Sequence, residues 1–165
     1  MTARRTFMFT DIVGSTRLAE ALGDDTWERL LRWHDDTSRG LISHGGGVVV
    51  NSTGDGFFAA FESARSAVDT AIAIQRAMRD HRDDTEVELR VRIGLHTSDA
   101  TQRGADYSGL GVHVAARIGA LAGGGEIVAS AATLEQAGDV AISAVRSEPV
   151  RGVTTPVEVA TVAWD

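Results

Sequence analysis

The spacing of apolar residues divides the chain into segments with two different periods. In several segments apolar side chains recur at intervals of three and four residues, which is the period of an amphipathic helix. Helices are predicted on this ground over 26–44, 63–81, 109–122 and 131–136, with another beginning at Gly14-Ser15-Thr16. Glycine triplets at 45–47 and 123–125 are expected to end two of these helices.

Shorter runs rich in β-branched and aromatic residues predict strands between the helices. Single strands are expected over 7–10, 87–96, 126–130, 140–145 and 157–163, and a hairpin over 48–61. The hairpin contains Asp55-Gly56, a pair that tolerates the positive φ angles of a tight turn. Residues 97–108 carry no such pattern and are expected to form a loop.

The order of these elements contains the split β-α-β-β-α-β pattern. We therefore expect a single α+β domain over residues 1–165. It would have a ferredoxin-like core, additional C-terminal strands, and helices covering one face of a mainly antiparallel sheet. Because such sheets support many unrelated activities, the fold alone predicts no function.

Composition narrows the chemistry that the chain can perform. The 165 residues include no cysteine, which excludes disulfides, zinc–thiolate sites and thiol catalysis. The formal net charge is −7 and no basic tract is present, which argues against a nucleic-acid partner. No apolar run approaches the roughly 20 residues of a membrane-spanning helix, and no charged-then-apolar leader opens the chain. These features are typical of a soluble, cytoplasmic domain without membrane contact.

Two aspartates stand at predicted strand ends. Asp11 closes the first strand and Asp55 lies in the hairpin turn. In the split pattern the first strand lies beside the hairpin, so the two carboxylates would repel each other unless a cation lay between them. Each aspartate also has a simpler interpretation by itself, Asp11 as a cap and Asp55 as a turn residue. The amides that follow Asp11 are candidates for binding phosphate at a helix N-terminus.

Four motifs occur together in this order: FTDIVGST, NSTGDGFFAAF, RIGLH and DYSGLGVHVAARI. Through them the chain resembles the catalytic domain of class III adenylate and guanylate cyclases, particularly actinobacterial members, from about residue 7 to residue 162. The resemblance implies a head-to-tail homodimer with two active sites, each built from both chains. It also implies two Mg²⁺ or Mn²⁺ ions held by Asp11 and Asp55, with the Ile12 carbonyl as a further ligand.

The resemblance implies further roles residue by residue. Arg92 would bind phosphate, although a solvated strand residue is its simpler interpretation. Arg117 would stabilise the charge that develops on the α-phosphoryl group. Arg151 stands where many members have a lysine that binds the triphosphate, and it keeps the charge. The amides that would cradle the terminal phosphates are those of Val13, Gly14, Ser15 and Thr16.

Two positions depart from the adenylate cyclase pattern. Asn51 replaces a lysine that reads the base together with Asp106; it can donate to adenine N1, but by rotating its amide it can also accept from guanine. His113 replaces the asparagine that orients the ribose, one helical turn before Arg117, and is alternatively only an interface residue. Tyr107 stacks near the base or merely packs. The other histidines are interpreted as structural or solvated: His34, His44, His81 and His96.

We expect an adenylate cyclase that converts ATP, with some leakage to GTP, into cyclic nucleotide and pyrophosphate by metal-assisted attack of the ribose 3′-hydroxyl. Asn51 and His113 leave open a weakly active or inactive regulatory cyclase-homology domain, or a cyclase with relaxed specificity. A diguanylate cyclase is not favoured, because its Gly-Gly-acidic-Glu-Phe signature is missing from the hairpin. Regulatory domains elsewhere in the native chain would fit either hypothesis.

Overall fold

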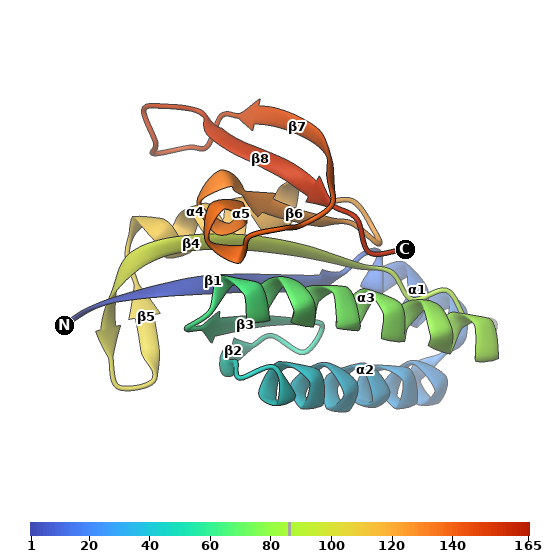
Figure 1. The fold of residues 1–165 in the computed structure, drawn as a ribbon. Coiled ribbons are helices and arrows are strands. Elements are labelled where there is room, and N and C mark those ends of the chain that lie inside the picture. The colour runs from blue at the N-terminus through green and yellow to red at the C-terminus, as the bar shows by residue number, and fades with distance from the viewer. Residues whose placement is uncertain (86) are drawn as a thin grey trace.

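Eight strands form one sheet in residues 1–85 and 87–165, the part of the chain that this computed structural model describes (Figure 1). The strands are β1 (Thr2–Ile12), β2 (Val48–Ser52), β3 (Gly56–Phe61), β4 (Val91–Arg103), β5 (Asp106–Ser108), β6 (Ile127–Ser130), β7 (Ile142–Glu148) and β8 (Val157–Val162). The helices are α1 (Ser15–Leu22), α2 (Asp24–His44), α3 (Ala64–Thr85), α4 (Leu110–Leu121) and α5 (Ala131–Ala137).

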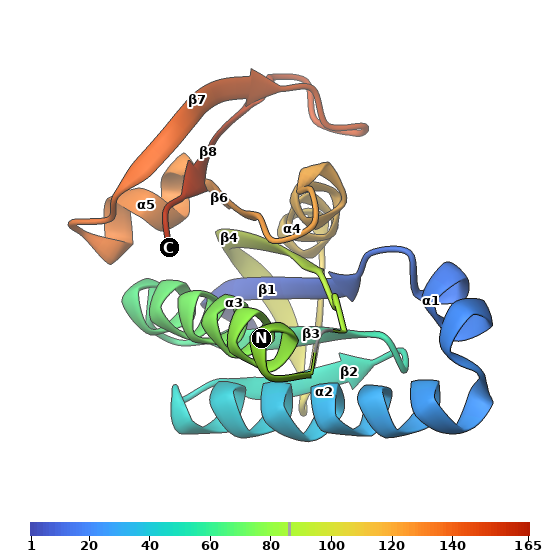
Figure 2. The same cartoon turned by 90° about the vertical axis from the view of Figure 1, so that its right-hand side faces the viewer.

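The strand order is β2-β3-β1-β4-β6-β8-β7, with β5 paired to β4 outside this path. The edge strands β2 and β7 lie at opposite ends of the molecule (Figure 2). The pair β4 and β6 is parallel, and the other pairs among the described strands are antiparallel. The first four strands have the order expected of a split β-α-β-β-α-β core, so the α+β fold predicted from the sequence is confirmed.

Helices cover both faces of the sheet, because β1 is apolar on both. Met8 packs in a cluster with Ile42 of α2 and Ile74 of α3, whereas its neighbour Phe7 packs in a cluster with Ala115 of α4. Adjacent strand residues point to opposite faces, so α2 and α3 lie on one face and α4 on the other. The expectation that the helices cover a single face is therefore wrong.

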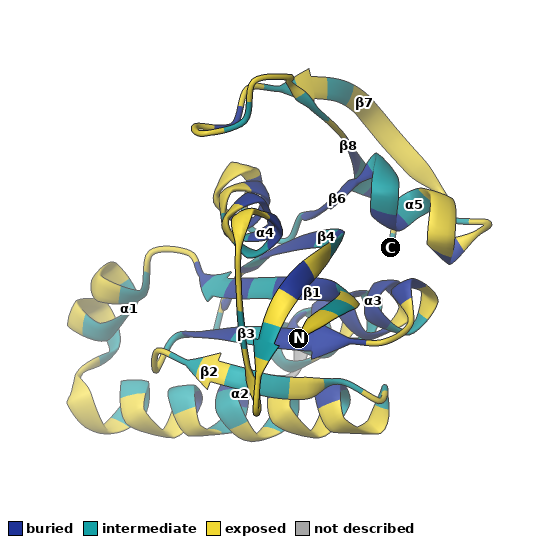
Figure 3. Cartoon of the chain, turned by 90° about the vertical axis from the view of Figure 1, so that its left-hand side faces the viewer, coloured by how far each residue is buried: buried dark blue, intermediate teal, exposed yellow. Residues whose placement is uncertain are grey.

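Glycines allow α4 to lie directly against β4. A Cβ built on Gly94 of β4 would lie 2.2 Å from the backbone nitrogen of Gly119 in α4. No side chain fits at this approach. Figure 3 shows the resulting distribution of burial, with the buried residues concentrated in the central strands and along the inner side of α3.

Strand pairing extends β1 and β4 beyond the apolar pattern at one end of each strand. Strand β1 begins at Thr2 rather than residue 7, since Thr2 pairs with Thr101 of β4. Strand β4 begins at Val91 rather than residue 87 and continues to Arg103, and residues 106–108 form β5. Part of the segment expected to be a loop is thus a two-stranded extension, whose polar residues gain backbone hydrogen bonds from their partners.

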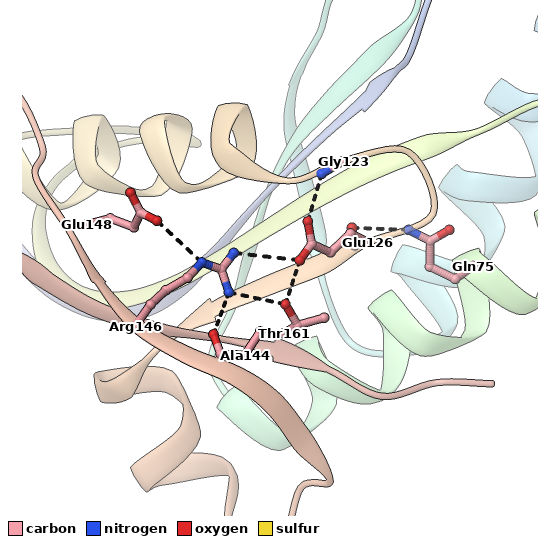
Figure 4. Close-up of polar contacts among 7 residues, drawn as sticks. All are labelled: Gln75, Gly123, Glu126, Ala144, Arg146, Glu148 and Thr161. Atoms are coloured by element: carbon pink, nitrogen blue, oxygen red, sulfur yellow. Dashed lines mark hydrogen bonds and ion pairs between the residues drawn. The ribbon is translucent and has the colours of Figure 1, made fainter.

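The β7–β8 pair is fixed to the rest of the sheet by a polar network around Arg146 (Figure 4). The Arg146 guanidinium lies 3.6 Å from Glu126 and 3.3 Å from Glu148. The Thr161 hydroxyl and the Gly123 amide both donate to the Glu126 carboxylate. The network joins β7 and β8 to Glu126, the residue before β6. It thereby fixes the strand ends from which the connecting segment 149–156 extends.

Candidate active site

The two aspartates lie side by side, Asp11 near the end of β1 and Asp55 in the turn between β2 and β3. Asp11 of β1 pairs in register with Gly56 of β3, and the Ile12 amide donates to the Asp55 carbonyl at 3.0 Å. A Cβ on Gly56 would lie 2.3 Å from the Thr10 carbonyl oxygen, so only glycine permits this close approach. The side-by-side arrangement expected from the split pattern is present.

Each carboxylate has one oxygen engaged by a neighbouring side chain. Arg92 of β4 donates to Asp11 Oδ2 through Nη2 at 2.8 Å and through Nε at 3.2 Å. The Ser15 hydroxyl donates to Asp55 Oδ2 at 2.9 Å. Within the described part of the chain, Oδ1 of either aspartate has no hydrogen-bond partner. These two oxygens are therefore available to a ligand.

The turn between β1 and α1 contributes backbone amides. Gly14 has a left-handed φ of 68° and stands at the N-cap of α1 without a side-chain capping bond. The helix begins at Ser15, as the sequence predicted, but the Ser15 hydroxyl binds Asp55 and does not cap the helix. The Val13 amide, predicted to be part of the phosphate cradle, donates to the Arg90 carbonyl at 2.9 Å. The first amides of α1 have no intrahelical partner.

These groups line one open cleft of about 540 Å³. It is bounded by Asp11, Ile12, Val13, Gly14, Ser15, Thr16, Arg17, Glu20, Asp55 and Arg92. Sequence reasoning missed Arg17 and Glu20 as cleft residues. The signal was present in their spacing, because residues three and six positions after Gly14 lie on one side of the first helical turns.

The donor set of this cleft fits a divalent cation. Carboxylate oxygens are the ligands that Mg²⁺ and Mn²⁺ prefer, and Asp11 and Asp55 each offer a free one. No group of three or more acidic or histidine side chains suited to a metal occurs among the described residues. Two carboxylates suffice when substrate phosphates and water supply the remaining ligands, as is usual for Mg²⁺.

The other predicted site residues form a second group outside this cleft. His113 and Arg117 lie on the exposed side of α4, one turn apart. His113 Nε2 lies 2.9 Å from the carbonyl oxygen of Arg151, whose side chain is exposed. None of these three residues lines the cleft of Asp11 and Asp55. One chain therefore carries two separate groups of predicted site residues.

The two predicted base-reading residues are exposed on the outer strands. Asn51 lies in β2 at an irregularity in its pairing with β3, opposite Phe58. Asp106 begins β5, and its Oδ1 accepts from the Tyr107 amide at 2.9 Å. The Tyr107 ring packs edge-on against Phe7, so packing accounts for this tyrosine. Neither Asn51 nor Asp106 lines the carboxylate cleft.

Two histidines outside the site have pKa values that burial lowers. His34 of α2 is fully buried, and desolvation lowers its pKa. His96 Nδ1 lies 2.7 Å from the Ser130 hydroxyl, and desolvation, reinforced by Arg4, lowers the pKa of His96 to about 4. The His81 ring stacks on Trp33. The burial of His34 and the contacts of His81 and His96 agree with the structural interpretation of these histidines.

Comparison with known proteins identifies the class. The family defined as the adenylate and guanylate cyclase catalytic domain matches residues 2–160. The chain therefore belongs to this family, and the resemblance carried by the four motifs is confirmed. Members of the family act on nucleotides, generally use divalent metal ions and assemble as dimers.

Individual relatives include cyclases of both specificities. The chain is 38% identical over 124 residues to putative adenylate cyclase 3 of Rhizobium meliloti, covering 73% of this chain and 21% of that protein. The crystal structure of the guanylyl cyclase Cya2 superposes with a TM-score of 0.89 at 26% identity, covering 99% of this chain and 93% of that one. The crystal structure of the adenylyl cyclase CyaB from P. aeruginosa superposes with a TM-score of 0.83 at 27% identity, covering 99% of this chain and 96% of that one.

The chain spans less than half the length of the curated relatives that it matches. Among the described residues, no helix has both the length and the apolar character needed to cross a membrane.

Proposed function

We propose that this chain is an adenylate cyclase domain that converts ATP into 3′,5′-cyclic AMP and pyrophosphate. The observation that carries the proposal is the convergence of Asp11, Asp55 and Arg92 on one cleft beside the N-terminus of α1. Two free carboxylate oxygens suit divalent cations, and a guanidinium with unpaired amides nearby suits a triphosphate.

Asp11 and Asp55 would hold the cations, with the Ile12 carbonyl as a further candidate ligand. When bound, the divalent ions neutralise the triphosphate and lower the pKa of the ribose 3′-hydroxyl. Arg92 would turn from Asp11 to a phosphate oxygen, and the amides of residues 14–16 would bind the terminal phosphates. The 3′-oxygen then bonds to the α-phosphorus as the bond to pyrophosphate breaks, and the hydroxyl proton is released to solvent.

The second group of residues would come from the other copy in a head-to-tail homodimer. His113, Arg117 and Arg151 are exposed and lie outside the carboxylate cleft of their own chain, as complementary halves of a shared site require. Arg117 would stabilise the charge on the α-phosphoryl group in the transition state. Arg151 would add charge against the triphosphate.

ATP is the proposed substrate because of Asp106. Its carboxylate only accepts hydrogen bonds, so it favours the amino group of adenine over the oxo group at the same position of guanine. Asn51 can serve either base, because its amide both donates and accepts. Specificity therefore depends on Asp106, and some turnover of GTP is expected.

The proposal is tested by product formation with Mn²⁺, offering ATP and GTP separately and reading cyclic nucleotide by mass spectrometry. Cyclic AMP in excess is expected, and Asp55→Ala should abolish it. Asp99→Ala is the matched control, since Asp99 is an exposed aspartate that pairs with Arg4 outside the cleft. Cyclic GMP in excess would overturn the assignment to ATP. No product at concentrations where the dimer forms would instead favour a regulatory cyclase-homology domain.

A further inference from the structure

The segment between β7 and β8 contains a tight turn whose second residue is Arg151. The Val153 amide donates to the Val150 carbonyl at 3.0 Å, and Gly152 has a φ of 90°. A glycine with positive φ at the third position is characteristic of a type II turn. The turn's own hydrogen bond uses the Val150 carbonyl, which leaves the Arg151 carbonyl free for an external donor.

His113 supplies that donor from α4. Its Nε2 lies 2.9 Å from the Arg151 carbonyl oxygen, across 38 residues of sequence. A carbonyl oxygen only accepts hydrogen bonds, so the contact requires a proton on Nε2. While this bond is formed, the same Nε2 proton is not available to the ribose of a substrate.

Apolar packing reinforces the contact. Val150, only 5% exposed, packs in one cluster with Val114 and Ile118 of α4. The turn is thus attached to α4 by this apolar packing and by the hydrogen bond from His113. The Arg146 network fixes the base of the same segment to the sheet, on the other side of Pro149 (Figure 4).

The Arg151 side chain itself remains exposed, and no hydrogen bond or ion pair holds its guanidinium among the described residues. Its location therefore depends on the backbone of the turn. Arg117 lies one helical turn after His113 on α4, so the bond from His113 brings the Arg151 backbone to the side of α4 that carries Arg117.

We propose that His113 is a positioning residue, whose Nε2 proton holds the Val150–Val153 turn on α4 and so presents Arg151 to the triphosphate. This inference rests on the proposed function for the role of Arg151, but the contact itself needs no substrate. It gives His113 a task different from orienting the ribose. It also links the departure from the family pattern at position 113 to the basic residue at position 151.

Substitutions of different side-chain length distinguish this positioning role from a general effect of replacing His113. A glutamine amide nitrogen reaches about as far along the side chain as His Nε2, whereas an asparagine amide nitrogen reaches only as far as Nδ1. His113→Gln should therefore keep the bond to Arg151, and His113→Asn should lose it. Both variants are neutral, polar amides at an exposed position, so the reach of the amide nitrogen is the main difference between them at this contact.

The first experiment measures amide hydrogen exchange of residues 149–156 in the nucleotide-free protein, with β1 as the internal control. Loss of one hydrogen bond corresponds to about 3- to 10-fold faster exchange. We expect that increase in His113→Asn and wild-type exchange in His113→Gln, with β1 unchanged in both. Unchanged exchange in His113→Asn, or equally fast exchange in both variants, would overturn the positioning role whether or not the protein is a cyclase.

The second experiment measures KM and kcat for MnATP in a double-mutant cycle with Arg151→Ala. His113→Asn should raise KM about 3- to 10-fold in the wild-type background and less than about 2-fold when Arg151 is already absent. His113→Gln should keep the wild-type KM. Equal increases of KM in both backgrounds would show that His113 does not act through Arg151. If neither the wild type nor any variant converts MnATP, the proposed function is wrong. The hydrogen-exchange experiment still tests the positioning role, because it needs no substrate.

Discussion

Arg92 and Asp11 form an ion pair between adjacent strands, with Nη2 of the arginine 2.8 Å from Oδ2 of the aspartate. The two residues are register partners of β4 and β1, although 81 positions separate them in sequence. Both side chains are more than one-third exposed, so the pair contributes little to folding stability. Its main effect is electrostatic, because it places a cation beside a carboxylate that the proposed metal would also use.

Arg92→Ala is expected to change metal and nucleotide binding in opposite directions. Removing the arginine removes a competing positive charge, so Mn²⁺ alone should bind about fivefold more tightly. The same variant loses a charged phosphate contact, so the nucleotide should bind about tenfold more weakly. Electron paramagnetic resonance of free Mn²⁺ and calorimetry with the nucleotide measure the two affinities.

Arg90→Ala is the control for that prediction. Arg90 lies two positions earlier in the chain and is hydrogen-bonded to Glu88 rather than to Asp11. Its loss should leave the affinity for Mn²⁺ near that of the wild type. Weaker Mn²⁺ binding in Arg92→Ala than in the wild type would contradict the idea that Arg92 competes with the cation for Asp11.

Mixing two inactive variants should restore activity if each site is shared. In a heterodimer of Asp11→Ala and Arg117→Ala chains, one site receives a wild-type aspartate from one chain and a wild-type arginine from the other. With random pairing of equal amounts, about a quarter of wild-type activity is expected. The measurement is cyclic AMP formation after subunit exchange has been demonstrated.

The matched control mixes Asp11→Ala with Asp55→Ala. These residues line the same cleft of one chain, so neither site of the heterodimer is repaired. Recovery in this mixture, or none in the first one, would count against a site divided between the two groups of residues.

Replacing glycine by alanine should change the free energy of unfolding in opposite directions at Gly94 and Gly40. A methyl group on Gly94 would meet the backbone of Gly119, so Gly94→Ala should lower the free energy of unfolding by about 2–3 kcal/mol. A methyl group on Gly40, within α2, would meet nothing within 4 Å, so Gly40→Ala should raise it by about 1 kcal/mol. Chemical denaturation measures both, and a stable Gly94→Ala protein would refute the close packing of α4 on β4.

His96 should make the folded state less stable in acid. Its pKa is about 4 in the fold against 6.5 in the unfolded chain. Above pH 6.5 the imidazole is neutral in both states and has no effect. Between pH 6.5 and 4 only the unfolded chain binds the proton, so stability falls by on the order of 1 kcal/mol per pH unit and levels off below pH 4.

His96→Asn tests this pH dependence, because asparagine can still hydrogen-bond the Ser130 hydroxyl but does not titrate. Denaturation of both proteins between pH 7 and pH 4 should give a shallower loss of stability for the variant. His34 is present in both proteins and its lowered pKa acts in the same direction, so the difference isolates His96. If the stability of the wild type and of His96→Asn fell equally with pH, the lowered pKa of His96 would not be the cause of the acid sensitivity.

Much of the local structure followed from the sequence because it depends on neighbouring residues. The periodicity of 109–122 predicted α4 within one residue at each end. Ser63 caps α3, as its hydroxyl accepts from the Ser66 amide at 3.1 Å. The four motifs pointed to the cyclase family, and the split pattern by itself put Asp11 beside the hairpin of Asp55.

Pairings between distant segments did not follow from the sequence. Residues 97–103 lack a strand pattern, yet they extend β4 because the start of β1 pairs with residues 97–101 and β5 pairs with residues 101–103. Helix α4 covers the opposite face from α2 and α3 because β1 is apolar on both faces. Neither fact is encoded in the spacing of nearby residues.

The sequence by itself determined the helices, most of the strands, the family and the identities of the residues proposed for the site, since these depend on local periodicity and on motifs in order. Only the tertiary structure decided how those residues divide between two groups, which carboxylate oxygens are free, and that His113 Nε2 lies within hydrogen-bond distance of the Arg151 carbonyl. The physical reason is that hydrogen bonds and ion pairs across 38 or 81 residues depend on strand order and turn geometry, which no short stretch of sequence specifies.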